Sequence, residues 1–121
     1  MNPMQRMAAH ARQSGVALQH CTACSHVQYP PRELCVACLA DQLEWRIAPS
    51  EAGVLLATSL LHHSHADEFR DALPLRVGVV QLDAGPSVIC FLDANCVVAT
   101  RVRITARNDA EGRAVLSAAP V

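Results

Sequence analysis

The amino-acid sequence predicts a mainly β protein with an N-terminal helix, a short metal-bound segment and a small closed barrel of five strands. Two CxxC pairs lie in the first third of the 121-residue chain, and five short strand-like runs separated by turn residues follow them. Apolar residues make up 51% of the chain and charged residues 17%, which is typical of a folded domain and excludes extended disorder.

Residues 2–13 are predicted to form a helix. A Ser-Gly pair follows this segment and is a typical stop signal. Apolar side chains recur in it at helical spacing: Met4, Met7, Ala8 and Ala11. The stripe suits packing against the rest of the chain, or against a partner or a second copy, because methionine adapts to irregular surfaces.

The two CxxC pairs, Cys21/Cys24 and Cys35/Cys38, carry the strongest chemical signal. A CxxC turn places two thiolates on one side of a tight bend, and two such turns facing each other complete a tetrahedral site. Four sulfur ligands favour zinc, with iron as the main competitor. A closed set of four ligands leaves no position for water, so we expect a structural metal rather than a catalytic one. A redox dithiol is the weaker alternative, since that motif is a single pair in a βαβ context.

The histidines are expected to lie outside the metal site. His20 and His26 flank the cysteines, but four thiolates already fill a tetrahedron, so we interpret both as surface groups or as neighbours of the ligands. His62, His63 and His65 form a second cluster. Adjacent strand residues point to opposite faces, so a solvated strand end is favoured over a second metal site.

The pattern of short apolar runs and turns after residue 48 predicts a small barrel. An Asp-Ala-Gly-Pro turn predicts a hairpin between the second and third runs, and 65–72 is a polar excursion. Cys90 lies within the third run and is read as a small buried hydrophobe, whereas Cys96 follows at a turn. The predicted strands are 54–61, 75–82, 88–92, 101–107 and 113–117.

Three arginines, Arg101, Arg103 and Arg107, share one face of the fourth predicted strand. A guanidinium group binds phosphate or carboxylate in bidentate fashion, so these are weak candidates for contact with a cofactor phosphate or an acidic partner. The alternative is a strand face that simply meets solvent.

Composition argues against nucleic acid as a partner. All ten basic residues are arginine, and eleven acidic residues give a formal net charge of −1. Only four aromatic residues are present, which is few for a platform that stacks bases.

The N-terminus lacks the apolar core of a secretory signal, and no run is long enough to span a membrane, so we expect a cytoplasmic protein. No nucleophile and base can be paired, which indicates a protein that is not itself an enzyme.

Several further segments accompany the two cysteine pairs: Tyr29-Pro30-Pro31-Arg32, Trp45, Gly53 with Thr58, and 73–86. With these residues the chain resembles, over nearly its whole length, the family catalogued as domain of unknown function 35 (DUF35), which combines a rubredoxin-like zinc ribbon with an OB-fold. Departures are Ser25, where glycine is common, Val36, where proline is common, and Ala99-Thr100 in place of a usual glycine.

The resemblance implies an N-terminal helix at 1–15, a zinc ribbon at 16–48 and an OB-fold domain at 49–121. It implies one structural Zn²⁺ and a non-catalytic role as an accessory subunit. The expected partner is a thiolase-like enzyme or another acyl-CoA enzyme, on which such a subunit docks and whose acyl-CoA site it helps to complete. CoA or acyl-CoA is then expected as a cofactor shared with that partner. The rival function is binding of single-stranded nucleic acid, because zinc ribbons and OB-folds also occur there.

Overall fold

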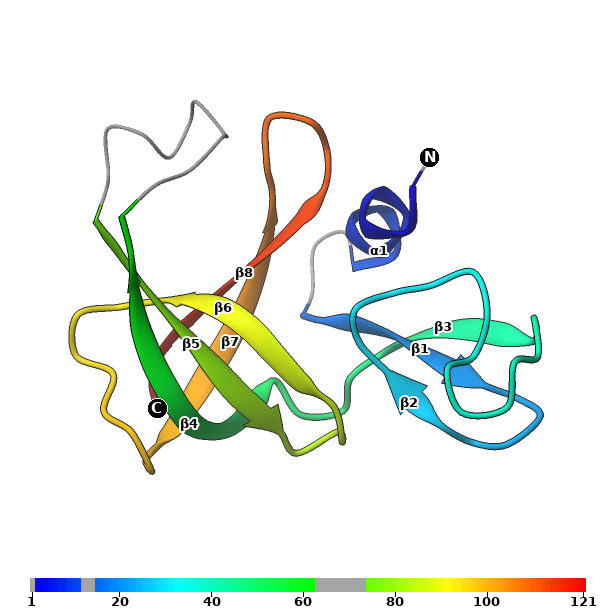
Figure 1. The fold of residues 1–121 in the computed structure, drawn as a ribbon, viewed down its shortest axis with the longest axis horizontal. Helices are drawn as coiled ribbons and strands as arrows, with labels where there is room; N and C mark the ends of the chain where they lie inside the picture. Colours follow the sequence, from blue (N-terminus) through cyan, green and yellow to red (C-terminus); the bar gives the residue numbers. More distant parts are fainter. Residues whose placement is uncertain (1, 12–14, 63–73) are drawn as a thin grey trace.

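The computed structural model describes residues 2–11, 15–62 and 74–121, and it is mostly β. Figure 1 shows a barrel and a smaller three-stranded sheet side by side, with the helix lying near the junction between them. The predicted excursion at 65–72, together with His63 and His65, lies outside the described residues. In the described part of the chain, no helix is long and apolar enough to cross a membrane.

Helix α1 (Pro3–Ala11) confirms the predicted helix. Asn2 caps it: its Oδ1 accepts a hydrogen bond from the Gln5 backbone N–H at 2.8 Å, and the Gln5 side chain accepts one from the Asn2 N–H at 3.0 Å. This reciprocal pair is a capping box, and Pro3 occupies the first helical position, where its missing N–H costs nothing.

Part of the apolar stripe of α1 is buried in the chain itself. Met7 is 1% exposed, Ala8 is buried beside it, and Met4 packs against the same core. Of the two roles that the sequence left open for the stripe, packing against the rest of the chain is the one that Met7 and Ala8 have, and their burial anchors the helix.

The cysteine region forms a small sheet of three antiparallel strands in the order β2-β1-β3. These strands are β1 (Ala17–Cys21), β2 (Val27–Gln28) and β3 (Leu43–Ile47). The strand β1 ends on the first metal-site cysteine, so the sheet places that thiol directly.

Five strands close the barrel in the order β4-β5-β6-β8-β7, which confirms the prediction. β6 and β8 pair in parallel, the other neighbours pair antiparallel, and β4 with β7 completes the closure. The predicted hairpin joins β5 and β6. The strands are β4 (Ala52–Leu61), β5 (Leu75–Leu82), β6 (Ser87–Leu92), β7 (Arg101–Asn108) and β8 (Ala114–Pro120).

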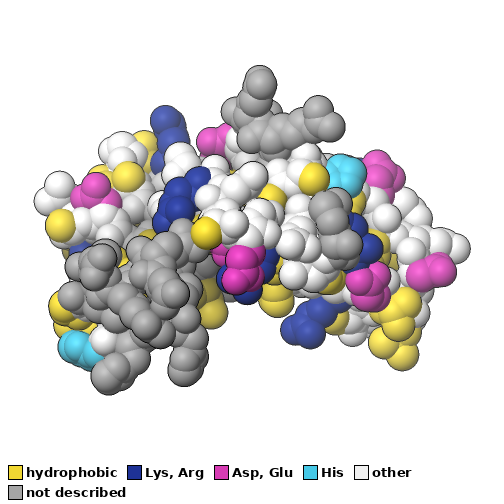
Figure 2. All heavy atoms as spheres, turned by 90° about the horizontal axis from the view of Figure 1, so that it is seen from above, with side chains coloured by type: hydrophobic (Ala, Val, Ile, Leu, Met, Phe, Trp, Pro, Cys, Tyr) yellow, Lys and Arg dark blue, Asp and Glu magenta, His cyan; other side chains and the backbone are white. Residues whose placement is uncertain are grey.

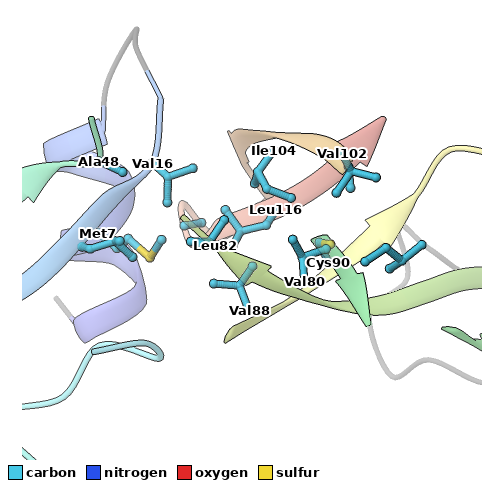
Figure 3. Packing of buried hydrophobic residues seen from close by; sticks show 14 of the residues in the cluster. Met7, Val16, Ala48, Val80, Leu82, Val88, Cys90, Val102, Ile104 and Leu116 are labelled. Atoms are coloured by element: carbon cyan, nitrogen blue, oxygen red, sulfur yellow. The ribbon is translucent and has the colours of Figure 1, made fainter. Parts of the chain in front are cut away.

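A continuous apolar core joins the barrel to the cysteine region. Figure 3 shows Met7, Val16 and Ala48 facing Leu82 and Leu116 of the barrel. A segment this short would bury little core alone, so the shared core supplies part of what the segment lacks. The division of the chain at residues 15 and 48 remains a prediction.

Candidate metal centre

The first cysteine pair lies on a turn with a defined backbone hydrogen-bond frame. The carbonyl of Cys21 accepts a hydrogen bond from the Ser25 N–H at 2.9 Å, and the Cys21 N–H donates to the carbonyl of His26 at 2.9 Å. The backbone of Ser25 is left-handed, with φ of 68°. The turn folds the chain back into β2 and places Cys24 beside Cys21.

The second pair repeats the same frame. The carbonyl of Cys35 accepts a hydrogen bond from the Leu39 N–H at 2.8 Å, and the Cys35 N–H donates to the carbonyl of Ala40 at 2.8 Å. Leu39 is again left-handed, with φ of 65°. The chain therefore contains two equivalent turns, which we call the first and second knuckle (residues 21–26 and 35–40).

The two knuckles bring four thiols together. The sulfur atoms of Cys21 and Cys38 lie 3.6 Å apart, as do those of Cys24 and Cys35, and all four lie within 4.8 Å of one another. Zn–S bonds of about 2.3 Å give a tetrahedron with edges of roughly 3.8 Å, so the cluster has the size that zinc requires. All four are free thiols. The cluster contains neither His20 nor His26, in line with the sequence interpretation.

The thiols influence one another's ionisation. Burial disfavours the thiolate of Cys35, but the backbone N–H groups of Cys38 and Ala37 and the neighbouring thiols outweigh it and lower its pKa to about 7. The N–H of His26 favours the thiolate of Cys24, yet burial and the other three thiols raise its pKa to about 12. One thiolate therefore forms first and opposes the next. A bound dication would relieve this repulsion, because metal ligation stabilises every thiolate.

Two family models match the chain in succession. The ChsH2 rubredoxin-like zinc ribbon domain matches residues 8–44, and the ChsH2 C-terminal OB-fold domain matches residues 45–107. The chain belongs to the ChsH2 family. No curated protein sequence gives a significant match.

Solved structures of ChsH2 and DUF35 proteins share the fold. A chain of the structure described as "Ltp2-ChsH2(DUF35) aldolase" is 19% identical with a TM-score of 0.75, and the match covers 99% of this chain and 96% of that one. A DUF35 protein of unknown function from Sulfolobus solfataricus is 16% identical with a TM-score of 0.63, covering 97% of this chain and 84% of that one. The fold expected from the resemblance is thereby confirmed.

The departures expected from the resemblance, Ser25 and Ala99-Thr100 in place of glycine, fall at left-handed backbone. Ser25 and Ala99 have a positive φ, of 68° and 70°. Glycine adopts this conformation freely, whereas a Cβ atom makes it costly. The third departure, Val36, uses an N–H that proline lacks: it donates to Oε1 of Gln28 at 2.9 Å.

We expect Leu39→Gly to stabilise the protein by about 0.5–1 kcal/mol, since relief of the left-handed strain exceeds the entropy cost of glycine. The Leu39 side chain is 73% exposed, so little burial is lost. Thermal unfolding of the metal-loaded protein measures the gain. Ala37→Gly is the matched control in the same knuckle, because Ala37 lacks a positive φ and glycine there should destabilise. A lower melting temperature for Leu39→Gly would contradict the expectation.

Sequence reasoning missed two buried polar residues beside the knuckles, Gln19 and Gln28, each 4% exposed. They are register partners across β1 and β2. The available signal was that Gln19 interrupts the apolar run that begins at Val16, a position where an apolar residue suits a buried strand.

The other candidate residues lie away from the thiol cluster. Arg101, Arg103 and Arg107 are exposed along β7. Arg101 is bound to Asp83 by two hydrogen bonds, of 2.5 and 3.1 Å, and this contact lowers the pKa of the Asp83 carboxyl group. His62 is exposed beyond the end of β4.

The remaining cysteines behave as buried apolar groups, as the sequence indicates for Cys90. Cys90 and Cys96 are each 3% exposed. The Cys96 thiol donates to the carbonyl of Ala118 at 3.4 Å, and burial raises the pKa of Cys90 to about 11. A thiol that stays protonated is a poor nucleophile.

Proposed function

We propose that this ChsH2-family chain is a non-catalytic accessory subunit that docks on a thiolase-like or related acyl-CoA enzyme and helps to complete its acyl-CoA site. The observation that carries the proposal is the match of both ChsH2 models in sequence order, over residues 8–107. The similar solved structure named as an Ltp2-ChsH2 aldolase is a complex of such a chain with another protein. A cytoplasmic location fits this role.

We also propose that Cys21, Cys24, Cys35 and Cys38 hold one structural zinc ion. The support is the size of the four-thiol cluster and the paired knuckles that carry it. Zinc here would join the two turns, and it would supply folding energy rather than chemistry, since a four-thiolate site offers no open position.

The exposed side chains suit a docking role better than catalysis. Leu34, Val36 and Leu39 of the second knuckle region are 46%, 59% and 73% exposed, and such clustered apolar groups are typical of contact surfaces. Leu39 is also held in a strained backbone conformation. An exposed apolar side chain at a strained position adds nothing to the stability of the fold, so Leu39 supports a role in contact with a partner.

Co-expression with an Ltp2-type enzyme from the same source tests the docking proposal. We expect the two proteins to co-purify as one species in size-exclusion chromatography, with enzyme activity and CoA affinity higher in the complex than in the enzyme alone. A partner enzyme that stays unbound, soluble and fully active without this chain would refute the proposal.

Charge substitutions on β7 separate contact with the partner from contact with the cofactor. We expect Arg101→Ala with Arg103→Ala to weaken the complex by up to ~30-fold, in a salt-dependent way, because exposed ion pairs contribute up to about 1 kcal/mol each and two are removed. CoA affinity of the remaining complex should be unchanged. Arg46→Ala is the matched control, since Arg46 is also an exposed arginine paired with an acid, Glu44.

Isothermal titration with CoA and with the partner gives both affinities. An intact complex with weaker CoA binding would show instead that the arginines face the cofactor.

Binding of single-stranded nucleic acid finds little support in the side chains. On the face shown in Figure 2, arginine and acidic side chains are interspersed rather than gathered into a basic patch. Trp45 stacks on His10 with ring centroids 5.3 Å apart, and Tyr29 packs against the core. Tight, salt-dependent binding of an oligonucleotide in fluorescence anisotropy would reverse this order of preference.

A further inference from the structure

We infer that Gln19 and Gln28 act as positioning residues for the metal site: together they hold the second knuckle against the first. This inference rests on the proposed zinc site. It concerns residues that carry no ligand atom.

The two glutamine side chains bind the backbone of the loop that leads into the second knuckle. Gln19 Oε1 accepts a hydrogen bond from the Arg32 N–H at 2.7 Å, and Gln19 Nε2 donates to the Arg32 carbonyl at 2.7 Å. Gln28 Nε2 donates to the Leu34 carbonyl at 3.2 Å, and Gln28 Oε1 accepts from the Val36 N–H at 2.9 Å. These side chains thus make the hydrogen bonds to the loop backbone that a neighbouring strand would otherwise make.

The two bonds of Gln28 to the loop lie on either side of one predicted zinc ligand, Cys35. Leu34 and Val36 flank Cys35, so Gln28 holds the backbone on both sides of this buried cysteine. Gln28 Nε2 also donates to Gln19 Oε1 at 2.9 Å, which joins the two side chains into one unit.

The two glutamines lie on the strands that flank the first knuckle. Gln19 lies two residues before Cys21 on β1, and Gln28 lies opposite it on β2. The side chains therefore connect the hairpin that bears one cysteine pair to the loop that bears the other. Contacts that orient metal ligands without touching the metal commonly change metal affinity about 10–100-fold.

Burial makes the arrangement specific. Both side chains are 4% exposed, and no buried side-chain nitrogen or oxygen among the described residues lacks a partner. Loss of the Gln28 amide would remove the partner of the Leu34 carbonyl and of the Val36 N–H, and a buried apolar side chain in its place would offer neither group a new one. Each knuckle would keep its own internal hydrogen bonds, so the expected defect is loss of alignment between knuckles, not loss of either turn.

The test compares Gln28→Met with the parent chain and with Gln42→Met, an exposed glutamine of the same region as matched control. Zinc-loaded proteins are mixed with a chromophoric chelator, and the release rate is measured. We expect release from Gln28→Met to be about 10–100-fold faster and the control to match the parent.

Pulsed alkylation with mass spectrometry distinguishes positioning from general destabilisation. In Gln28→Met we expect Cys35 and Cys38 to be labelled before Cys21 and Cys24, while Cys90 in the barrel core stays protected. Equal labelling of all these thiols, or a release rate equal to that of the control, would overturn the inference.

Val36→Pro removes one of the bonds that Gln28 makes, the one from the Val36 N–H to its Oε1, and leaves both glutamines in place. We expect faster zinc release and the same labelling order, to a smaller extent, and this variant decides the question if Gln28→Met does not fold. A parent chain that retains no metal would refute the zinc site itself, and this inference with it. A parent with slow zinc release and variants that match it would refute the inference alone.

Discussion

Replacing Cys35 by serine should abolish metal retention and unfold the cysteine region. Cys35 is fully buried at the start of the second knuckle, and serine offers zinc a much poorer ligand. A structural zinc in a small domain contributes apparent binding energy of about 10–16 kcal/mol, which exceeds what the three-stranded sheet can supply by itself. Metal removal from the parent chain with a strong chelator should have the same result.

Trp45 lies on β3 and is the only tryptophan, so its fluorescence reports the cysteine region selectively. We expect a red shift on chelation of the parent, and the shifted spectrum from the start in Cys35→Ser. Native mass spectrometry should give one zinc per parent chain and none per variant. The control is Cys90→Ala, which removes a buried thiol outside the cluster and should leave zinc content unchanged.

An unshifted spectrum after complete loss of metal would show that the shared core holds the region alone. Val16 and Ala48 do pack with barrel residues, so some loss of barrel stability should accompany unfolding.

Gly53→Ala should destabilise the barrel by ~3 kcal/mol or more, because there is no room for a side chain. A Cβ atom at this position would lie 2.3 Å from the carbonyl oxygen of Gln81, a backbone atom that cannot rotate away. Gly53 pairs with Leu82 of β5 on one side and with Val102 of β7 on the other. Both ladders would have to shift, and β4 with β7 is the pair that closes the barrel.

Chemical denaturation of the zinc-loaded protein measures this loss. Gly112→Ala is the comparison: Gly112 has φ of 78° but nothing within 4 Å of the added Cβ. It should cost only about 1 kcal/mol, from backbone strain alone. Equal losses for the two variants would show that the close contact at Gly53 relaxes easily.

The sequence by itself determined the features that depend on local chemistry. Two CxxC pairs at this spacing specify two knuckles and a four-thiol cluster, because thiolate geometry and a tight turn leave few alternatives. The capped helix and the five barrel strands follow from local signals as well: apolar periodicity and turn residues are properties of neighbours in the chain. The strand at 75–82 has the predicted bounds.

The tertiary structure alone decided which surfaces remain available. The apolar stripe of α1 could have packed on a partner or on the chain itself, and only the tertiary structure shows that Met7 and Ala8 are buried in the core. Arg101 and Arg103 look equivalent in sequence, yet Arg101 on β7 forms an ion pair with Asp83, which lies in the turn between β5 and β6. Gln19 and Gln28 look like ordinary polar residues, but pairing of β1 with β2 buries both and directs them to the loop at 32–36. Each case depends on residues distant in the chain, and local patterns carry no information about which of them meet.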